Sequence, residues 1–117
     1  MMTHEERLAA KTEDRWASMN QIEEANRYAG QHFFDPDTMR FFKSRISAHV
    51  YYGRIFVTSE KGPDEIRRYT VRRQRRNGSM DTLGEFQGYA TSRQAHKAAG
   101  TESAKLQLRD HLRKVTS

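Results

Sequence analysis

Residues 67–76 hold six arginines and no acidic residue, around an apolar centre formed by Tyr69 and Val71. The alternation of apolar and polar side chains is typical of a β-strand, in which successive residues point to opposite faces. Asn77 and Gly78 follow at once, and this dipeptide is a strong signal for a tight hairpin turn. The chain is therefore expected to contain an antiparallel sheet in which the arginine-rich strand pairs with the segment after the turn.

The residues on either side of this strand extend the predicted sheet. Period-two alternation predicts a hairpin formed by residues 46–50 and 54–58. A further strand is predicted for residues 81–89, although Gly84 weakens it. The sheet should contain three or four antiparallel strands.

Helical signals lie before and after the predicted sheet. Capping residues and three-to-four-residue apolar spacing predict helices over residues 19–30 and about 36–43. Another helix is predicted from Ser92, or the residue before it, toward the C-terminus. Gly100 leaves open whether this last segment forms one helix or two.

The order of these elements predicts an α+β fold, with helices before and after the sheet packed on one of its faces. Residues 1–17 are expected to form a charged N-terminal arm or helix, followed by a single domain over residues 18–117. Because only 35% of the residues are hydrophobic, the aromatic residues should supply much of the core, although one of them could instead stack on a base. The phenylalanines concerned are Phe33, Phe34, Phe41 and Phe42.

Charge is distributed unevenly along the chain. Residues 1–37 carry 4 basic and 8 acidic side chains, whereas residues 38–117 carry 17 basic and 7 acidic ones. The excess of positive charge favours a nucleic-acid partner, although an acidic protein or an anionic membrane surface would attract it too. No apolar run reaches the roughly 20 residues of a membrane span, so a cytoplasmic protein without a membrane partner is expected.

Strand alternation assigns the arginines to two faces. The face of Tyr69 and Val71 should pack against the helices, which would leave the opposite face exposed, with three arginines, a glutamine and Thr70. Two more arginines of the strand should lie near the projecting turn, and two cations should lie at the start of the last helix. The nucleic-acid contacts predicted from the sequence are Arg68, Arg72, Gln74, Arg76, Arg73, Arg75, Arg93 and Lys97.

Three family resemblances accompany this pattern. Residues 88–95, which follow the basic strand and its turn, resemble the end of the AP2-like DNA-binding arm domain of phage integrases. In that family three strands dock in the major groove, so the resemblance, over residues 67–99, implies that Arg68, Arg72 and Arg76 face the groove. The helix that precedes the sheet departs from that pattern.

A second resemblance is to double-stranded RNA-binding domains, in the order of elements and in the Gly62-Pro63 loop. Glu65, Ser92 and Gly100 stand where that family has a histidine, a lysine and an alanine, which places RNA below duplex DNA as the expected partner. More broadly, most of the chain resembles a family of short uncharacterised proteins from phages, prophages and other mobile elements. That resemblance covers about residues 19–99, is most distinctive over residues 84–99 and implies no activity.

No catalytic pattern is apparent in the sequence. There is no cysteine, and the five histidines show no metal-ligand spacing, so no enzyme, cofactor or metal site is expected. The sequence therefore predicts a small non-catalytic nucleic-acid-binding protein with duplex DNA as the favoured partner. The alternative is a phage or mobile-element module that binds a host protein through Trp16, Tyr51, Tyr52 and the arginines.

Overall fold

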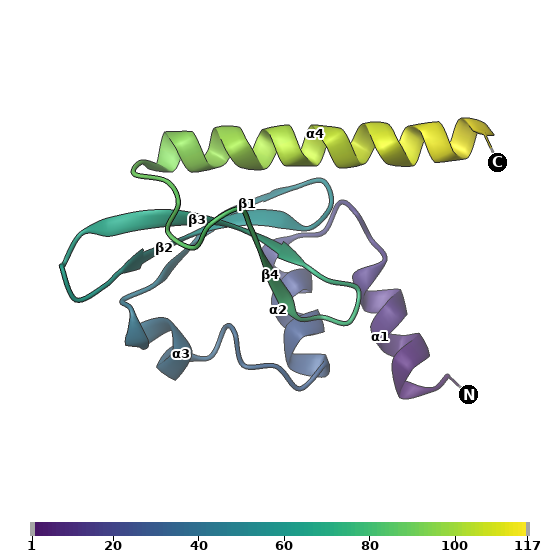
Figure 1. The fold of residues 1–117 in the computed structure, drawn as a ribbon. Helices are drawn as coiled ribbons and strands as arrows, with labels where there is room; N and C mark the ends of the chain where they lie inside the picture. Colours follow the sequence, from purple (N-terminus) through teal and green to yellow (C-terminus); the bar gives the residue numbers. More distant parts are fainter. Residues whose placement is uncertain (1, 117) are drawn as a thin grey trace.

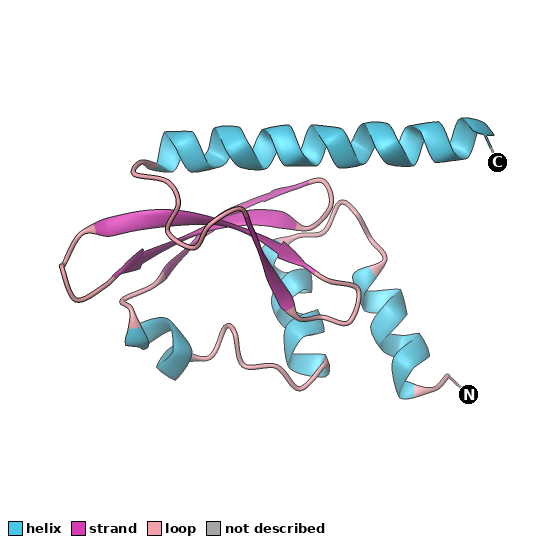
Figure 2. Ribbon diagram, in the orientation of Figure 1, coloured by secondary structure: helices cyan, strands magenta, loops and turns pink. Residues whose placement is uncertain are grey.

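The structure, a computed structural model, describes residues 2–116 and contains four helices and four strands in that part of the chain (Figure 1). Three helices precede the strands and one long helix follows them (Figure 2). The helices are α1 (His4–Thr12), α2 (Met19–Tyr28), α3 (Pro36–Phe41) and α4 (Ser92–Thr116). The strands are β1 (Arg45–Tyr51), β2 (Ile55–Lys61), β3 (Arg67–Gln74) and β4 (Met80–Leu83).

The strands form one antiparallel sheet in the order β1-β2-β3-β4. The predicted hairpins are confirmed, and Gln74 pairs with Met80 across the turn that contains Gly78. The arginine strand ends at Gln74 rather than at residue 76. The last strand is much shorter than the predicted residues 81–89, because the chain leaves the sheet at Gly84, where φ is +80°, and returns only for a single bridge between Tyr69 and Tyr89.

One face of the sheet is covered by α4 (Figure 1). Val57 and Val71 of the sheet pack against Ala95 and Ala99, whose small side chains allow the helix to lie close to the strands. Tyr69 joins this cluster, as its alternation with Val71 predicts. The helix runs through Gly100 without a break, so the last segment forms one helix of 25 residues.

The helices that precede the sheet lie on its other face (Figure 1). Ile22 of α2 packs on Phe56, and the half-buried Phe33 and Phe34 lie beside them. The predicted α+β class is confirmed, but the helices are divided between the two faces instead of sharing one. The assignment of all four phenylalanines to the core is wrong for Phe41, which is 78% exposed at the end of α3.

Arg54 attaches the N-terminal segment to the sheet. Its guanidinium is buried and donates through Nε to Asp14 O at 2.9 Å, through Nη2 to Lys11 O, and through Nη1 to Gln74 Oε1 at 2.7 Å. Because Lys11 lies in the last turn of α1, the cation caps the negative end of that helix. Burial lowers the pKa of Arg54, and no carboxylate among the described residues lies within ion-pair distance of it.

Substitution of Gly78 tests how closely α2 packs against the hairpin turn. A Cβ atom at Gly78, where φ is +87°, would lie 2.8 Å from Ala25 O and 2.8 Å from Ala29 Cβ. Gly30 has a similar φ of +76° but no atom within 4 Å of such a Cβ. We expect Gly30→Ala to lower the free energy of unfolding by about 1 kcal/mol and Gly78→Ala by about 1 to 3 kcal/mol more. If urea denaturation showed the same loss of unfolding free energy for Gly30→Ala and Gly78→Ala, the close approach of α2 to the turn would be contradicted.

Candidate nucleic-acid interface

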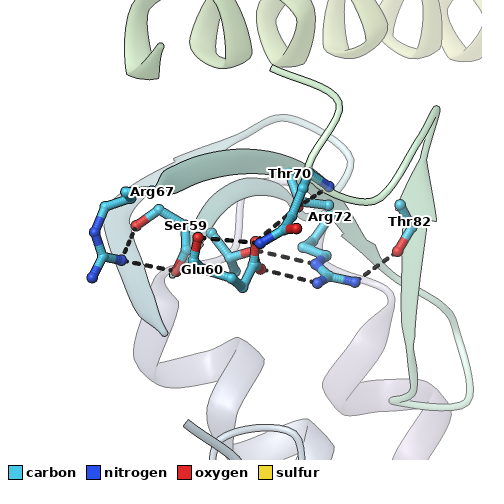
Figure 3. A network of polar contacts seen from close by, with 8 residues as sticks. Ser59, Glu60, Arg67, Thr70, Arg72 and Thr82 are labelled. Carbon is cyan, nitrogen blue, oxygen red and sulfur yellow. Dashed lines mark hydrogen bonds and ion pairs between the residues drawn. The ribbon is translucent and has the colours of Figure 1, made fainter. Parts of the chain in front are cut away.

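A buried ion pair joins β2 and β3 on the face of the sheet opposite α4 (Figure 3). The Glu60 carboxylate accepts hydrogen bonds from Thr58 Oγ1 at 2.6 Å, Thr70 Oγ1 at 2.9 Å and Arg72 Nη2 at 3.1 Å. Arg72 also donates to Thr82 Oγ1 at 2.6 Å. A buried carboxylate with three donors and a buried guanidinium with several acceptors satisfy each other, so removal of one partner would leave the other charge buried and uncompensated.

The prediction that this face of the sheet is exposed is therefore wrong. The Arg72 side chain is only 13% exposed and lies between the rings of Phe33 and Phe86, 5.4 and 5.3 Å from their centroids. Thr70 is buried, and Gln74 is buried with its amide donating to Ile22 O and Gly78 O. The polar side chains face α2, the adjoining loops and the Glu60 carboxylate instead of solvent.

The three outer arginines predicted as contacts remain accessible, but each is engaged in an ion pair. Arg68 Nη1 lies 2.8 Å from Asp64 Oδ2, near the start of β3. Beyond the other end of the strand, Arg75 pairs with Asp81 at 2.6 Å, and Arg76 pairs with Glu13 at 2.8 Å. Exposed pairs of this kind contribute roughly 0 to 1 kcal/mol, so another anion can replace the carboxylates at little cost.

The structure does not bring the start of α4 to the arginine-rich turn. Arg93 and Lys97 are exposed on the first turns of α4, and this end of the helix lies beside Arg45 of β1. Arg75 and Arg76 follow the opposite end of β3, in the hairpin that leads to β4 (Figure 1). The predicted contacts thus separate into two ends of the sheet and a buried network between them.

Arg73, Arg75 and Arg76 line a hollow of about 300 Å³ between the β3–β4 hairpin and the segment after α1, here called the arginine hollow. The lining comes from the end of β3, the hairpin after it and β4, and from the end of α1, the loop after it and the turn before β2. The lining residues are Thr12, Glu13, Arg15, Arg54, Arg73, Gln74, Arg75, Arg76 and Asp81. Five arginines against two carboxylates make the hollow strongly positive.

Arg73 and the buried Arg54 both line this hollow without a carboxylate partner among the described residues, and Arg73 is the more accessible of the two. The half-buried guanidinium of Arg73 donates through Nε to Gly53 O at 3.3 Å, and within the described part of the chain no carboxylate lies within 4 Å of it. Burial lowers the pKa of Arg73 most and the neighbouring cations Arg15 and Arg109 lower it further, whereas the more distant carboxylates of Asp110 and Asp81 raise it. A guanidinium held among other guanidiniums retains most of its donors for an anion from outside.

Asp110 of α4 is a carboxylate that lies beside Arg15 and Arg109. Its Oδ2 accepts a hydrogen bond of 2.7 Å from Tyr52 and lies 3.9 Å from Arg15 Nε, and its Oδ1 lies 3.8 Å from Arg109 Nε. The Tyr52 hydroxyl lowers the pKa of Asp110 most, and Arg15, Arg109 and Arg113 lower it further. The same hydrogen bond raises the pKa of Tyr52.

Three arginines in or beside the hollow were not predicted from the sequence: Arg15, Arg54 and Arg109. They come from the loop after α1, the turn before β2 and the second half of α4. The convergence of the three arises from tertiary packing, which no local pattern indicates.

Two other kinds of site are absent from the described residues. These residues contain no group of three or more His, Cys, Asp or Glu side chains placed to hold a metal ion. None of their helices is both long and apolar enough to cross a bilayer.

The network in Figure 3 predicts a large difference between two arginine–carboxylate pairs. Glu60→Gln leaves the buried guanidinium of Arg72 without its carboxylate and should lower the free energy of unfolding by about 3 kcal/mol. Adding Arg72→Met should restore part of that loss, because the buried charge is removed as well. Arg68→Met, which breaks the exposed pair with Asp64, is the control and should cost less than about 1 kcal/mol. Similar losses for Glu60→Gln and Arg68→Met would mean that the network does not stabilise the fold.

The lowered pKa of Asp110 predicts that this residue contributes to stability in a pH-dependent way. Its pKa is lowered in the folded protein, so the stabilisation is complete above the unfolded pKa of about 4 and is lost as the pH falls through the folded value. The free energy of unfolding of wild type should exceed that of Asp110→Asn at neutral pH, and the difference should shrink toward about pH 3. Urea denaturation of both proteins across this range measures the effect, and a difference that does not change with pH would exclude it.

Comparison with known proteins identifies a family and no close relative. Neither the search of curated proteins nor the search of solved structures found a match. A family model described as a family of unknown function, DUF7447, matches residues 18–100, which include α2, the whole sheet and the first turns of α4. The chain belongs to this family of unknown function, DUF7447.

Proposed function

We propose that the protein is a non-catalytic nucleic-acid-binding protein that contacts the phosphates of duplex DNA through the arginine hollow. The observation that carries this proposal is Arg73, a half-buried guanidinium beside Arg15 and Arg109 without a carboxylate partner in the described chain. Concentrating cations at one place is unfavourable unless an anion neutralises them. A DNA backbone supplies closely spaced phosphates, and guanidinium groups bind phosphate bidentately.

The exposed ion pairs around the hollow support this function. A phosphate can displace Asp81 from Arg75 and Glu13 from Arg76, because both pairs are solvent-exposed and contribute little. The released carboxylates lie at the rim and can remain in water. Phosphate contacts position a protein on the duplex without reading its sequence, so the hollow supports binding of low sequence specificity.

The proposed contact differs from the docking mode that the integrase resemblance implied. The side of β3 that carries Arg72 and Gln74 is covered by protein, so it is not available to a major groove. The proposed contacts are therefore Arg15, Arg73, Arg75 and Arg76, which line the hollow, with Arg109 as a neighbouring cation. A mobile-element setting remains a prediction. Arg68, Arg93 and Lys97 lie outside the hollow.

An acidic host protein is the second candidate partner. Trp16 is 64% exposed and follows Arg15 directly, and aromatic and arginine side chains contribute much of the energy at protein interfaces. Tyr51 and Tyr52 are half-buried, with their hydroxyls bonded to His96 Nδ1 at 2.9 Å and to Asp110, so they support this function less than Trp16 does.

The salt dependence of DNA binding tests the proposal. Arg73→Ala should weaken binding to a short duplex about tenfold and reduce the slope of log affinity against log salt by about one. Fluorescence anisotropy of a labelled duplex between about 50 and 200 mM salt measures both quantities. The proposal predicts an unchanged slope for Lys97→Ala, a cation of α4 outside the hollow.

Asp110→Asn supplies the converse variant. It removes the carboxylate beside Arg15 and Arg109 while keeping an oxygen for the Tyr52 hydroxyl, so it should bind duplex more tightly than wild type. Affinity that is insensitive to Arg73→Ala and to salt would overturn the proposal. If Lys97→Ala abolished duplex binding and Arg73→Ala did not, the start of α4 would be the contact instead of the hollow.

A further inference from the structure

A second basic hollow, of about 410 Å³, lies at the opposite end of the sheet from the arginine hollow and is here called the α3 hollow. Its wall comes from the end of α3, the turn after it and the adjoining ends of β1, β2 and β3. Five of its seven lining residues are cationic and none is acidic. They are Met39, Arg40, Lys43, Ser44, Arg45, Lys61 and Arg67.

Neighbouring acids neutralise only part of this charge. Arg40 pairs with Asp37 at 2.6 Å, and Glu65 pairs with both Lys43 at 2.8 Å and Lys61 at 3.5 Å. Both acids are well exposed at the rim, so a competing anion can displace them cheaply. Two carboxylates against five cations leave three positive charges unmatched.

The two remaining cations differ in their contacts. Arg67 donates to Ser59 Oγ at 2.9 Å and to Lys43 O at 3.0 Å, which fixes its guanidinium at the base of the hollow. Arg45 is exposed, and its side chain makes no hydrogen bond or ion pair with the other described residues. The hollow therefore contains one anchored cation and one free cation.

Exposed aromatic rings stand beside these cations. Phe41 follows Arg40 and is 78% exposed, with its ring edge-to-face on Phe42 at 4.6 Å. Phe42 in turn lies 6.2 Å from Phe86, which is 48% exposed. The three rings form a contiguous row, which is more informative than a single exposed ring, and Phe41 and Phe42 lie between Arg40 and Lys43 in the sequence.

The backbone around this hollow is held in a conformation that side chains rarely adopt. Lys43 has a φ of +49° and its ion-pair partner Glu65 a φ of +61°. Positive φ costs free energy at residues other than glycine and tends to occur where function requires a particular geometry. The turn at Lys43 ends α3 and directs the chain from the exposed Phe41 into β1.

We propose that the α3 hollow binds single-stranded nucleic acid, with a phosphate between Arg45 and Lys43 and an unpaired base stacked on Phe41. Single-strand binding sites combine a positive groove for the backbone with aromatic faces for the bases, and both components are present here. A free phosphate or an acidic peptide would use the cations but would leave the aromatic face without a role. This site shares no residue with the arginine hollow, so it goes beyond the duplex binding proposed above.

A tryptophan placed at residue 41 reports stacking directly. Trp16 is the chain's single tryptophan, so Trp16→Phe combined with Phe41→Trp gives one reporter at the site. An oligothymidylate of about ten nucleotides should quench its fluorescence to saturation, and salt should reverse the quenching. Equal quenching by inorganic phosphate or by a polyglutamate peptide of the same length would overturn the proposal.

Alanine variants supply the second measurement. Phe41→Ala and Arg45→Ala should each weaken oligothymidylate binding about fivefold or more. Leu108→Ala is the matched control, since Leu108 is an exposed apolar residue of α4 outside the hollow, and it should bind as wild type does. Binding that is unaffected by Phe41→Ala, in a protein whose thermal unfolding is unchanged, would overturn the proposal.

The same variants separate the two sites. Phe41→Ala should leave duplex affinity unchanged, and Arg73→Ala should leave the quenching at residue 41 unchanged. If Arg73→Ala abolished binding of both nucleic acids while Phe41→Ala affected neither, the α3 hollow would be excluded and the duplex proposal would stand. If Phe41→Ala weakened binding of both nucleic acids while Arg73→Ala affected neither, the arginine hollow would be excluded and the proposal for the α3 hollow would stand.

Discussion

The ion pair between Glu60 and Arg72 determines how the two sides of the sheet can be used. It lies on the side covered by α2, α3 and their connecting loop, where the guanidinium is also held between the rings of Phe33 and Phe86. Two charges can be buried there only because each satisfies the other and the surrounding threonines supply the remaining hydrogen bonds. Because of this pair, the middle of the most basic strand is buried, and the accessible positive charge lies at the ends of the strand.

Much of the fold could be predicted from the sequence because its signals are local. The alternation of Tyr69 and Val71 gave the correct helix-facing side of β3, and Asn77-Gly78 gave the correct turn. Alternation cannot distinguish a polar residue that faces water from one that faces an opposite charge. The partner of Arg72 is Glu60, on the neighbouring strand, and their pairing depends on strand register.

The candidate sites were less predictable because they arise where strands end and other elements converge. Arg73 was expected near the projecting turn and lines the arginine hollow, but its neighbours Arg15 and Arg109 are far away in the sequence. The exposure of Phe41 was missed for a related reason. A phenylalanine in a polar chain is usually buried, and only the short length of α3 and the turn at Lys43 leave this ring outside the core.

The capping of α1 by Arg54 links that helix to whatever occupies the arginine hollow. Two of the three acceptors of this guanidinium, Lys11 O and Asp14 O, belong to the segment that precedes the family region. Because Arg54 is only 2% exposed, an anion bound in the hollow as proposed would reach this guanidinium only if α1 were released. Docking of α1 and binding of an anion to Arg54 would then oppose each other, and linkage requires that each weaken the other by the same factor.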